Sequence, residues 1–174
     1  MKGFLSPPAI LPGAANPIWI RTAGEGDVDK LASYFGGLSC GARYNRFIGA
    51  VGDLSNRARD CLMPTRKSDV FTLVAEWCEH GRSTVIGEAS YGYDRFEERG
   101  EFAISVSDQI QRHGLGSALL GALQSRALSL GCSELFGETL KGNEDMKNLA
   151  RKAGFAFTRS SDWRAVRFDK TLKG

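Results

Sequence analysis

The chain has 174 residues, of which 42% are hydrophobic and 25% charged, and its formal net charge is +3. This composition is typical of one globular domain whose hydrophobic core is large enough to fold without disulfides or a structural metal. The mild, scattered charge argues against a nucleic-acid-binding protein, and the lack of a long apolar run argues against a membrane-spanning helix. We therefore expect a cytoplasmic protein with one functional cleft.

The N-terminal segment, residues 1–17, has one charge at Lys2, and prolines interrupt its apolar residues. Such a segment does not match a signal peptide, so we predict a flexible arm followed by a single domain over residues 18–174. The cysteines and histidines lack metal-ligand spacing, which predicts buried free thiols and no metal site. These residues are Cys40, Cys61, Cys78, Cys132, His80 and His113.

The domain is predicted to begin with one strand and to continue with helices. Ile18–Thr22 is short, apolar and β-branched, as strands are, whereas apolar residues recur at helical spacing from Asp27 to Phe35. The Gly36-Gly37 pair ends this helix, and a second amphipathic stretch follows up to Leu62. Pro64 then marks a boundary before the sheet.

Three consecutive strands are predicted at Val70–Glu76, Thr84–Tyr93 and Glu101–Val106. Polar turns separate them, and such short connections predict an antiparallel meander. In the third strand, apolar residues alternate with Glu101, so the carboxylate is expected to face away from the core. The core-facing residues of that strand are Phe102, Ile104 and Val106.

A glycine-containing loop and a helix follow the third strand. Leucines and alanines repeat at helical spacing from Leu115 to Leu130, and Gly131 ends the helix. The remaining predicted elements are a strand at Glu134–Thr139, a helix at Asn143–Ala153, and strands at Phe155–Phe157 and Ala165–Phe168. This order of strands and helices places the chain in the α/β (α+β) class.

The loop between the third strand and the helix has the sequence Gln111-Arg112-His113-Gly114-Leu115-Gly116. Glycines let a ligand approach the backbone, and free N–H groups at a helix start favour phosphate oxygens. Two glycines alone also occur in ordinary turns. A dinucleotide-binding fingerprint needs Gly or Ala at position 119, where this chain has Leu119, and a P-loop needs a Gly-Lys-Ser/Thr sequence that is absent.

With its Gln-x-x-Gly-x-Gly pattern after an apolar strand, the run from Phe102 to Leu130 resembles the GNAT superfamily of N-acetyltransferases. A second block, from Asn143 to Gly154-Phe155, is similar to the family's pattern of Asn, a short helix and Gly-Phe. The resemblance implies the GNAT fold, a central mixed and mostly antiparallel sheet of about six to seven strands flanked by about four helices. It also implies acetyl-CoA as co-substrate and no metal.

The resemblance further implies how acetyl-CoA binds. Backbone groups of the loop hold its pyrophosphate, and the end of the third strand pairs with its pantetheine arm as an added strand would. Asn143 is expected to contact the pantetheine or phosphates, or to cap the following helix, and both roles are compatible. The other residues concerned are Ile104, Ser105, Val106, Gln111, Arg112, His113, Gly114, Leu115, Gly116 and Ser117.

Transfer to an amine requires a base or a desolvating cleft, because a lysine-like amine has a pKa near 10.4. Glu101 is the candidate base, and Glu88 and Glu138 are alternatives. Glu101 can also be interpreted as a solvated carboxylate of the hairpin turn without a catalytic role. The runs Leu38-Ser39 and Arg43-Tyr44-Asn45-Arg46-Phe47, together with Glu101-Phe102-Ala103, resemble the acetyltransferase domain of bacterial protein-lysine acetyltransferases. In that group this Glu acts as the base.

The resemblance assigns the oxyanion donor to the backbone N–H of Val106. Many members of the family protonate the leaving thiolate with a tyrosine at the position of Ala150, so the general acid is open here. Coenzyme A leaves as a thiolate that water protonates, or one of three hydroxyl side chains contributes. Those three are Tyr91, Ser160 and Ser161.

The acceptor is expected to be a protein lysine or a small amine. Residues 38–62 and the acidic turn 94–100 are predicted to wall its binding side. The sequence allows a homodimer and indicates neither nucleic acid nor a membrane as a partner. Two rival functions are an acyl-CoA-binding sensor without turnover, suggested by Ala150, and a small nucleotide- or nucleic-acid-binding module.

Overall fold

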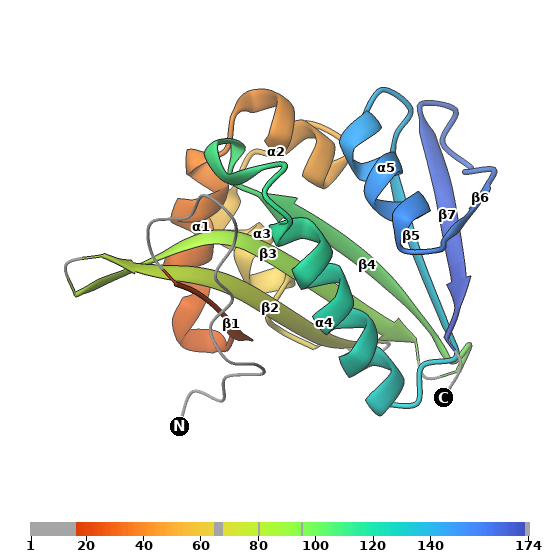
Figure 1. Ribbon diagram of the computed structural model, residues 1–174, viewed down its shortest axis with the longest axis horizontal. Coiled ribbons are helices and arrows are strands. Elements are labelled where there is room, and N and C mark those ends of the chain that lie inside the picture. Colours follow the sequence, from red (N-terminus) through yellow and green to blue (C-terminus); the bar gives the residue numbers. More distant parts are fainter. Residues whose placement is uncertain (1–16, 65–67, 80, 95, 173–174) are drawn as a thin grey trace.

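A seven-stranded sheet forms the centre of the molecule in the computed structural model, which describes residues 17–64, 68–79, 81–94 and 96–172 (Figure 1). The strands lie in the order β1-β2-β3-β4-β5-β7-β6, and every neighbouring pair is antiparallel except β4 and β5. The predicted mixed, mostly antiparallel sheet is therefore confirmed. Its strands are β1 (Ile18–Thr22), β2 (Ser68–Glu79), β3 (Arg82–Asp94), β4 (Arg99–Val106), β5 (Glu134–Leu140), β6 (Ala156–Thr158) and β7 (Ala165–Thr171). The predicted N-terminal arm lies outside the described residues, apart from Pro17.

Five α-helices cover the two faces of the sheet, where about four were expected. The predicted second amphipathic stretch is two helices, because Ile48 adopts a left-handed conformation (φ 51°) and the side chain of Asp53 caps a new helix at Asn56 N. Two short 3-10 helices, Glu25–Asp27 and Asp108–Ile110, complete the set. The α-helices are α1 (Val28–Gly37), α2 (Cys40–Phe47), α3 (Leu54–Asp60), α4 (Leu115–Ser129) and α5 (Glu144–Lys152).

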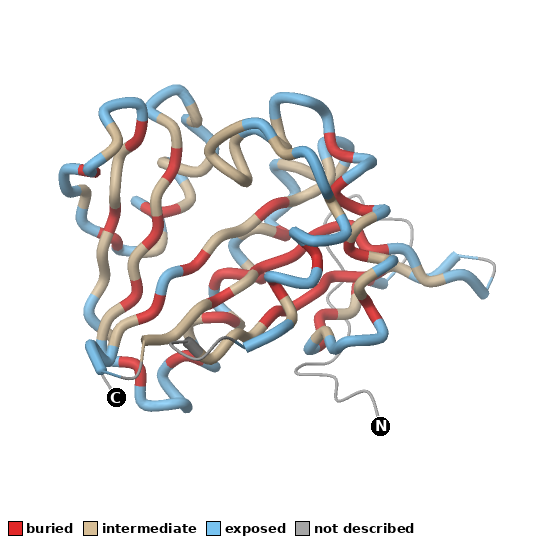
Figure 2. The backbone as a smooth tube through the Cα atoms, turned by 180° about the vertical axis from the view of Figure 1, so that it is seen from behind, coloured by how far each residue is buried: buried red, intermediate tan, exposed pale blue. Residues whose placement is uncertain are grey.

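Apolar side chains form one core on each face of the sheet. The larger core lies under α4, whose Leu115, Leu119, Leu120 and Leu123 are each 1% exposed or less. The smaller core joins α1 and α3 to β2 and β3 on the opposite face. Seen from behind, buried residues follow the central strands while the turns at the ends of the sheet are exposed (Figure 2). Burial on both faces explains why the central strands are rich in apolar residues.

The parallel pair β4 and β5 is short and then opens. The two strands pair only over Arg99–Glu101 and Glu134–Phe136, and beyond this point they separate (Figure 1). Aromatic rings fill the core beside this opening, with Phe102 and Phe168 centred 5.7 Å apart. A Cβ at Gly137 of β5 would approach Phe168 Cε2 to 2.6 Å, so only glycine leaves room for these rings. The separation of β4 and β5 positions the site described below.

The cysteines are all free, but the prediction that all four are buried is wrong for Cys40 and Cys78. Both are exposed because they lie near the ends of elements, at the start of α2 and close to the end of β2. Within the described ranges, no group of His, Cys, Asp or Glu side chains is arranged to hold a metal ion. No helix there has the length and apolar content needed to span a membrane.

Candidate active site

The glycine-containing loop ends at an uncapped helix N-terminus. Gly114, with φ 90°, is the N-cap residue of α4 and supplies no capping side chain. Helix geometry leaves the N–H groups of Leu115, Gly116 and Ser117 without intrahelical acceptors, directed out of the first turn. Together with the helix dipole, these groups form an anion-binding concavity suited to phosphate oxygens. The predicted loop thus has the local geometry that a pyrophosphate requires.

Side chains hold this loop against the neighbouring elements. Gln111 Nε2 donates to the carbonyl oxygen of Val106 at 3.1 Å, and His113 Nδ1 lies 2.8 Å from the carbonyl oxygen of Gln111. Arg112 has a left-handed backbone (φ 66°), and its exposed guanidinium lies 3.3 Å from both carboxylate oxygens of Asp145 in α5. The loop therefore joins the end of β4 to the first turn of α5.

The edge of β4 that faces β5 has free backbone groups beyond Glu101. Ser107 N donates to the carbonyl oxygen of Ile86 at 2.9 Å, which fixes the alternation of the antiparallel ladder with β3. By that alternation the N–H and C=O groups of Phe102, Ile104 and Val106 point away from β3, toward the opening. An extended, amide-containing ligand can pair with such an edge. Ser105 points its backbone groups to β3 instead, and the carbonyl oxygen of Val106 already accepts from Gln111 Nε2. Within 104–106 the free groups are therefore the N–H and C=O of Ile104 and the N–H of Val106.

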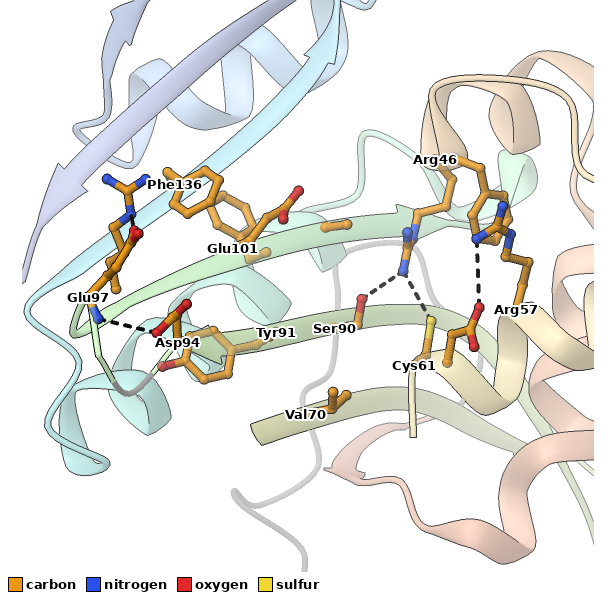
Figure 3. A pocket seen from close by; sticks show the side chains of 16 residues that line it. Arg46, Arg57, Cys61, Val70, Ser90, Tyr91, Asp94, Glu97, Glu101 and Phe136 are labelled. Atoms are coloured by element: carbon orange, nitrogen blue, oxygen red, sulfur yellow. Dashed lines mark hydrogen bonds and ion pairs between the residues drawn. The ribbon is translucent and has the colours of Figure 1, made fainter. Parts of the chain in front are cut away.

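A cleft of about 470 Å³ lies on the face of the sheet that α2 and α3 cover in part (Figure 3). Glu101 lies in it beside Phe136 of β5, with Arg46 and Cys61 farther along the cleft. The two segments expected to wall the acceptor side both contribute. From them come Arg46, Phe47, Arg57, Asp60, Cys61, Asp94, Glu97 and Arg99. The opening between β4 and β5 thus has the glycine-containing loop at one end and, on one face, a cleft lined by both acidic and basic side chains.

A model described as the acetyltransferase (GNAT) family matches residues 43–155, well over half of the chain. The chain belongs to the GNAT acetyltransferase family. An acetyltransferase of Pseudomonas aeruginosa is 26% identical over 145 residues, which are 83% of this chain and 78% of that protein. As a GNAT protein, the chain is an acyl-CoA-dependent N-acyltransferase with acetyl-CoA as the family's acyl donor.

Two solved structures are similar to this chain in fold. The GNAT domain of S. lividans PAT has a TM-score of 0.82, 22% identity, and coverage of 97% of both chains. A ribosomal-protein-alanine N-acetyltransferase from Brucella melitensis has a TM-score of 0.64, 24% identity, and coverage of 88% of this chain and 99% of the other. At these identities the likeness shows the GNAT fold alone.

Glu101 differs from the other carboxylates of this GNAT cleft in its surroundings. Its side chain is exposed, and among the described residues no hydrogen bond or ion pair holds it. The pKa of Glu101 is raised, first because the walls of the cleft remove part of the water around the carboxylate and then because the charge of Glu138 opposes ionisation. Arg167 and Arg46 act in the opposite direction. A free carboxylate with a raised pKa can accept and release a proton.

Glu88, an alternative base from the sequence, lies in a buried ion pair. It is 0% exposed, and Arg46 Nε donates to its Oε1 at 2.5 Å while Ser105 Oγ donates at 2.8 Å. Arg46 also donates to Ser90 Oγ at 2.7 Å. A carboxylate satisfied by these donors has no access to an incoming amine. The sequence interpretation of Glu88 as a base does not fit this geometry, whereas a structural role does.

Tyr34 and Ser105 extend this network, and the sequence did not predict either contact. The Tyr34 hydroxyl in α1 donates to Ser105 Oγ at 3.1 Å, so α1 is tied to β4 between Ile104 and Val106. Burial first, and then the charge of Glu88, raise the pKa of Tyr34, which keeps its hydroxyl a proton donor. The only sequence signal of this network was Glu88 within an apolar strand, because a buried charge requires hydrogen-bonding or charged partners.

Glu138 lies on β5, on the same face as Phe136 and two residues further along the opening. Ser160 Oγ donates to Glu138 Oε1 at 3.1 Å and accepts from Asp162 N at 3.0 Å. Ser160, one of the candidate general acids, therefore orients a carboxylate. Of the other two candidates, Tyr91 has a hydroxyl buried without a hydrogen-bond partner among the described residues, and Ser161 is exposed.

Asn143 caps α5, as one of its two interpretations predicted. Its Oδ1 accepts from Met146 N at 3.2 Å, and its Nδ2 donates to Thr139 Oγ1 at 2.9 Å. Ala150, at the position where many GNAT proteins have tyrosine, is fully buried in the larger core. No hydroxyl therefore reaches the opening from that position of α5.

Changing Gly114 to Asp is expected to weaken acetyl-CoA binding by roughly 10- to 100-fold, because a carboxylate would lie against the phosphates. Calorimetric titration with acetyl-CoA measures the effect. Gly114→Asn is the matched control, since it adds nearly the same side chain at the same left-handed φ without the charge. Equal affinities for the Asp and Asn variants would contradict phosphate binding at this helix start.

Proposed function

We propose that this GNAT protein transfers the acetyl group of acetyl-CoA to a primary amine, of a protein lysine or a small molecule, with Glu101 as general base. The observation that carries the proposal is the carboxylate of Glu101 at the point where β4 and β5 part, to which no described residue donates a hydrogen bond. The binding loop and the free edge of β4 meet the same opening. The expected cytoplasmic location and the absence of nucleic-acid partners stay predictions.

The proposed reaction begins with deprotonation of the acceptor. An alkylammonium with a pKa near 10.4 is deprotonated to less than about 0.1% at pH 7, so removal of its proton has to be assisted. Glu101 accepts that proton, directly or through one water, and the amine then attacks the thioester that acetyl-CoA supplies. The N–H of Val106 donates to the thioester oxygen as negative charge develops there. The tetrahedral intermediate then collapses as its C–S bond breaks, and coenzyme A leaves as a thiolate. The second proton of the attacking nitrogen passes through water to that thiolate.

The experiment that tests this function is a turnover screen of the purified protein with acetyl-CoA and a panel of primary amines, in which free coenzyme A and acetylated amine are quantified by chromatography. Equal amounts of both products are expected. Binding of acetyl-CoA without release of coenzyme A on any amine would indicate the sensor instead. Salt-dependent binding of oligonucleotides without binding of acetyl-CoA would indicate the nucleic-acid module.

Changing Glu138 to Gln is expected to move the acidic limb of the kcat/KM profile to lower pH. The charge of Glu138 helps to raise the pKa of Glu101, so its removal lowers that pKa and keeps the base ionised in more acidic solution. Glu97→Gln is the control, because Glu97 lines the same cleft and neither Glu97 nor its ion-pair partner Arg99 is among the groups that shift the pKa of Glu101. An acidic limb that stays in place would mean that another group sets the profile.

A further inference from the structure

We infer that Gly92 determines which acceptors reach Glu101, admitting a primary amine carried on a slender, unbranched chain. The inference rests on the proposed function, because it names the class of acceptor for the same cleft. Gly92 lies on β3, directly opposite Glu101 in the ladder between β3 and β4. Residues opposite one another in a ladder share a face of the sheet, so Gly92 is next to the proposed base.

The other glycines of β3, β4 and β5 are explained by packing, and Gly92 is not. A Cβ at Gly87 would meet Leu119 Cδ1 at 3.1 Å, one at Gly100 would meet Tyr91 Cε2 at 2.0 Å, and one at Gly137 would meet Phe168 Cε2 at 2.6 Å. A Cβ at Gly92 would meet nothing within 4 Å. Gly92 does not have a positive φ either, so its backbone accepts any residue. The missing side chain leaves open space in the cleft.

Residues with small side chains, Gly92, Ser90 and Ala103, form the floor of the cleft next to Glu101. Val70, Gly92, Glu101 and Phe136 make one row across four strands, and Ser90 and Ala103 lie beside Gly92 and Glu101 in the next row. All six line the cleft. The apolar ends of the row, Val70 and Phe136, suit methylene groups, and the glycine between them leaves room for a chain of that width. A branched or cyclic substituent at this point would contact the floor.

Charges at the rim agree with a cationic acceptor. Each arginine of the cleft has a carboxylate partner. Arg99 forms an ion pair with Glu97 at 2.7 Å, and Arg57 lies 3.7 Å from Asp60. Arg46 forms its ion pair with the buried Glu88. These contacts neutralise the arginines that line the cleft. Among the described residues, no lysine or arginine forms an ion pair with Glu101 or Asp94. An ammonium group entering over Gly92 therefore meets carboxyl groups that no such side chain occupies.

The test uses Nα-acetyl-lysine N-methylamide as the acceptor, whose amine ends an unbranched four-carbon chain. Gly92→Ala is expected to lower kcat/KM for this probe by about 10-fold and Gly92→Leu by more than about 100-fold, since one methylene in a fitted pocket is worth about 10- to 200-fold. The affinity for acetyl-CoA, measured by calorimetry, is expected to stay within about twofold. Gly121→Leu is the control, because Gly121 is exposed on α4 and also has open space at Cβ.

A second variant separates occlusion from misfolding. Gly92→Cys treated with a bulky methanethiosulfonate is expected to lose turnover of the probe and to regain it when a reductant removes the adduct. Wild type receives the same reagents and is expected to keep its activity, because Cys40 and Cys78 lie outside the cleft and burial raises the pKa of the Cys61 thiol. Recovery on reduction shows that the Gly92→Cys variant was folded throughout.

The outcomes distinguish this inference from the function on which it rests. Full turnover of the probe by Gly92→Leu and by the modified Gly92→Cys variant would overturn the inference and leave the acetyltransferase proposal intact. The same follows if wild type acetylates other amines but not this probe. If wild type binds acetyl-CoA and transfers it to no amine, both proposals fail.

Discussion

Changing Glu101 to Gln is expected to lower kcat/KM for an accepted amine by roughly 10² to 10⁴, the usual contribution of a positioned general base. The amide keeps the shape of the carboxylate but cannot take the proton. Wild-type activity is expected to fall as the pH drops through the raised pKa of Glu101, above the usual range of a glutamate. The variant is expected to lack this acidic limb. Measuring kcat/KM from pH 5 to 9 for both proteins tests the assignment.

The stability of the Glu101→Gln protein provides the control. A carboxyl group whose pKa is raised on folding lowers the stability of the native state once the pH exceeds its unfolded pKa. Removing the charge is therefore expected to leave the free energy of unfolding at pH 7 unchanged or slightly higher. Affinity for acetyl-CoA is also expected to stay the same. An unchanged pH profile and kcat/KM in the variant would remove Glu101 from catalysis.

Changing Arg46 to Ala is expected to lower the free energy of unfolding by about 3 to 5 kcal/mol. The side chains of Arg46 and Glu88 are 8% and 0% exposed, so the substitution leaves a buried carboxylate without its cation. It also removes a donor to Ser90 and a guanidinium 5.0 Å from the Phe47 ring centre. Urea unfolding followed by circular dichroism measures the loss.

Two further variants make the Arg46 prediction specific. Arg57→Ala breaks the exposed contact to Asp60, with side chains 51% and 67% exposed, and is expected to cost at most about 1 kcal/mol. The double variant Arg46→Ala with Glu88→Gln is expected to be more stable than Arg46→Ala alone, because no charge is then left unpaired. A loss for Arg46→Ala no larger than that for Arg57→Ala would show that the buried pair is dispensable.

Much of the fold could be predicted from the sequence, since it depends on local patterns. Alternating apolar residues located the strands, the leucine spacing located α4, and Gly114 marked its start. Strand ends were less predictable because hydrogen bonding to neighbours extends them, and β2 runs from Ser68 to Glu79 where Val70 to Glu76 was expected. The break between α2 and α3 depends on the left-handed Ile48, a conformation that β-branched residues rarely adopt.

The site was predictable only where residues of one motif act together. The loop and the end of β4 are contiguous, so their proximity could be predicted from the sequence, whereas their joint role in binding acetyl-CoA is what the family resemblance implies. The partners of Glu88 could not be predicted, because Arg46 and Tyr34 lie on other elements. Arg46 and Glu88 are 42 positions apart in the sequence, and Tyr34 and Ser105 are 71 positions apart. Gly92 was also missed, since a strand glycine has no local sequence signal that separates tight packing from open space.

The parting of β4 and β5 means that the sheet contains an incomplete hydrogen-bond ladder in its interior. A ligand that completes this ladder binds the native state and not the unfolded chain, so it stabilises the fold by mass action, by about 2.7 kcal/mol at a hundred times its Kd. With the expected pairing of acetyl-CoA along β4, the persistence of this protein in a cell would be linked to the pool of acylated coenzyme. When that pool falls, the open strand edge becomes a site for unwanted pairing with other chains.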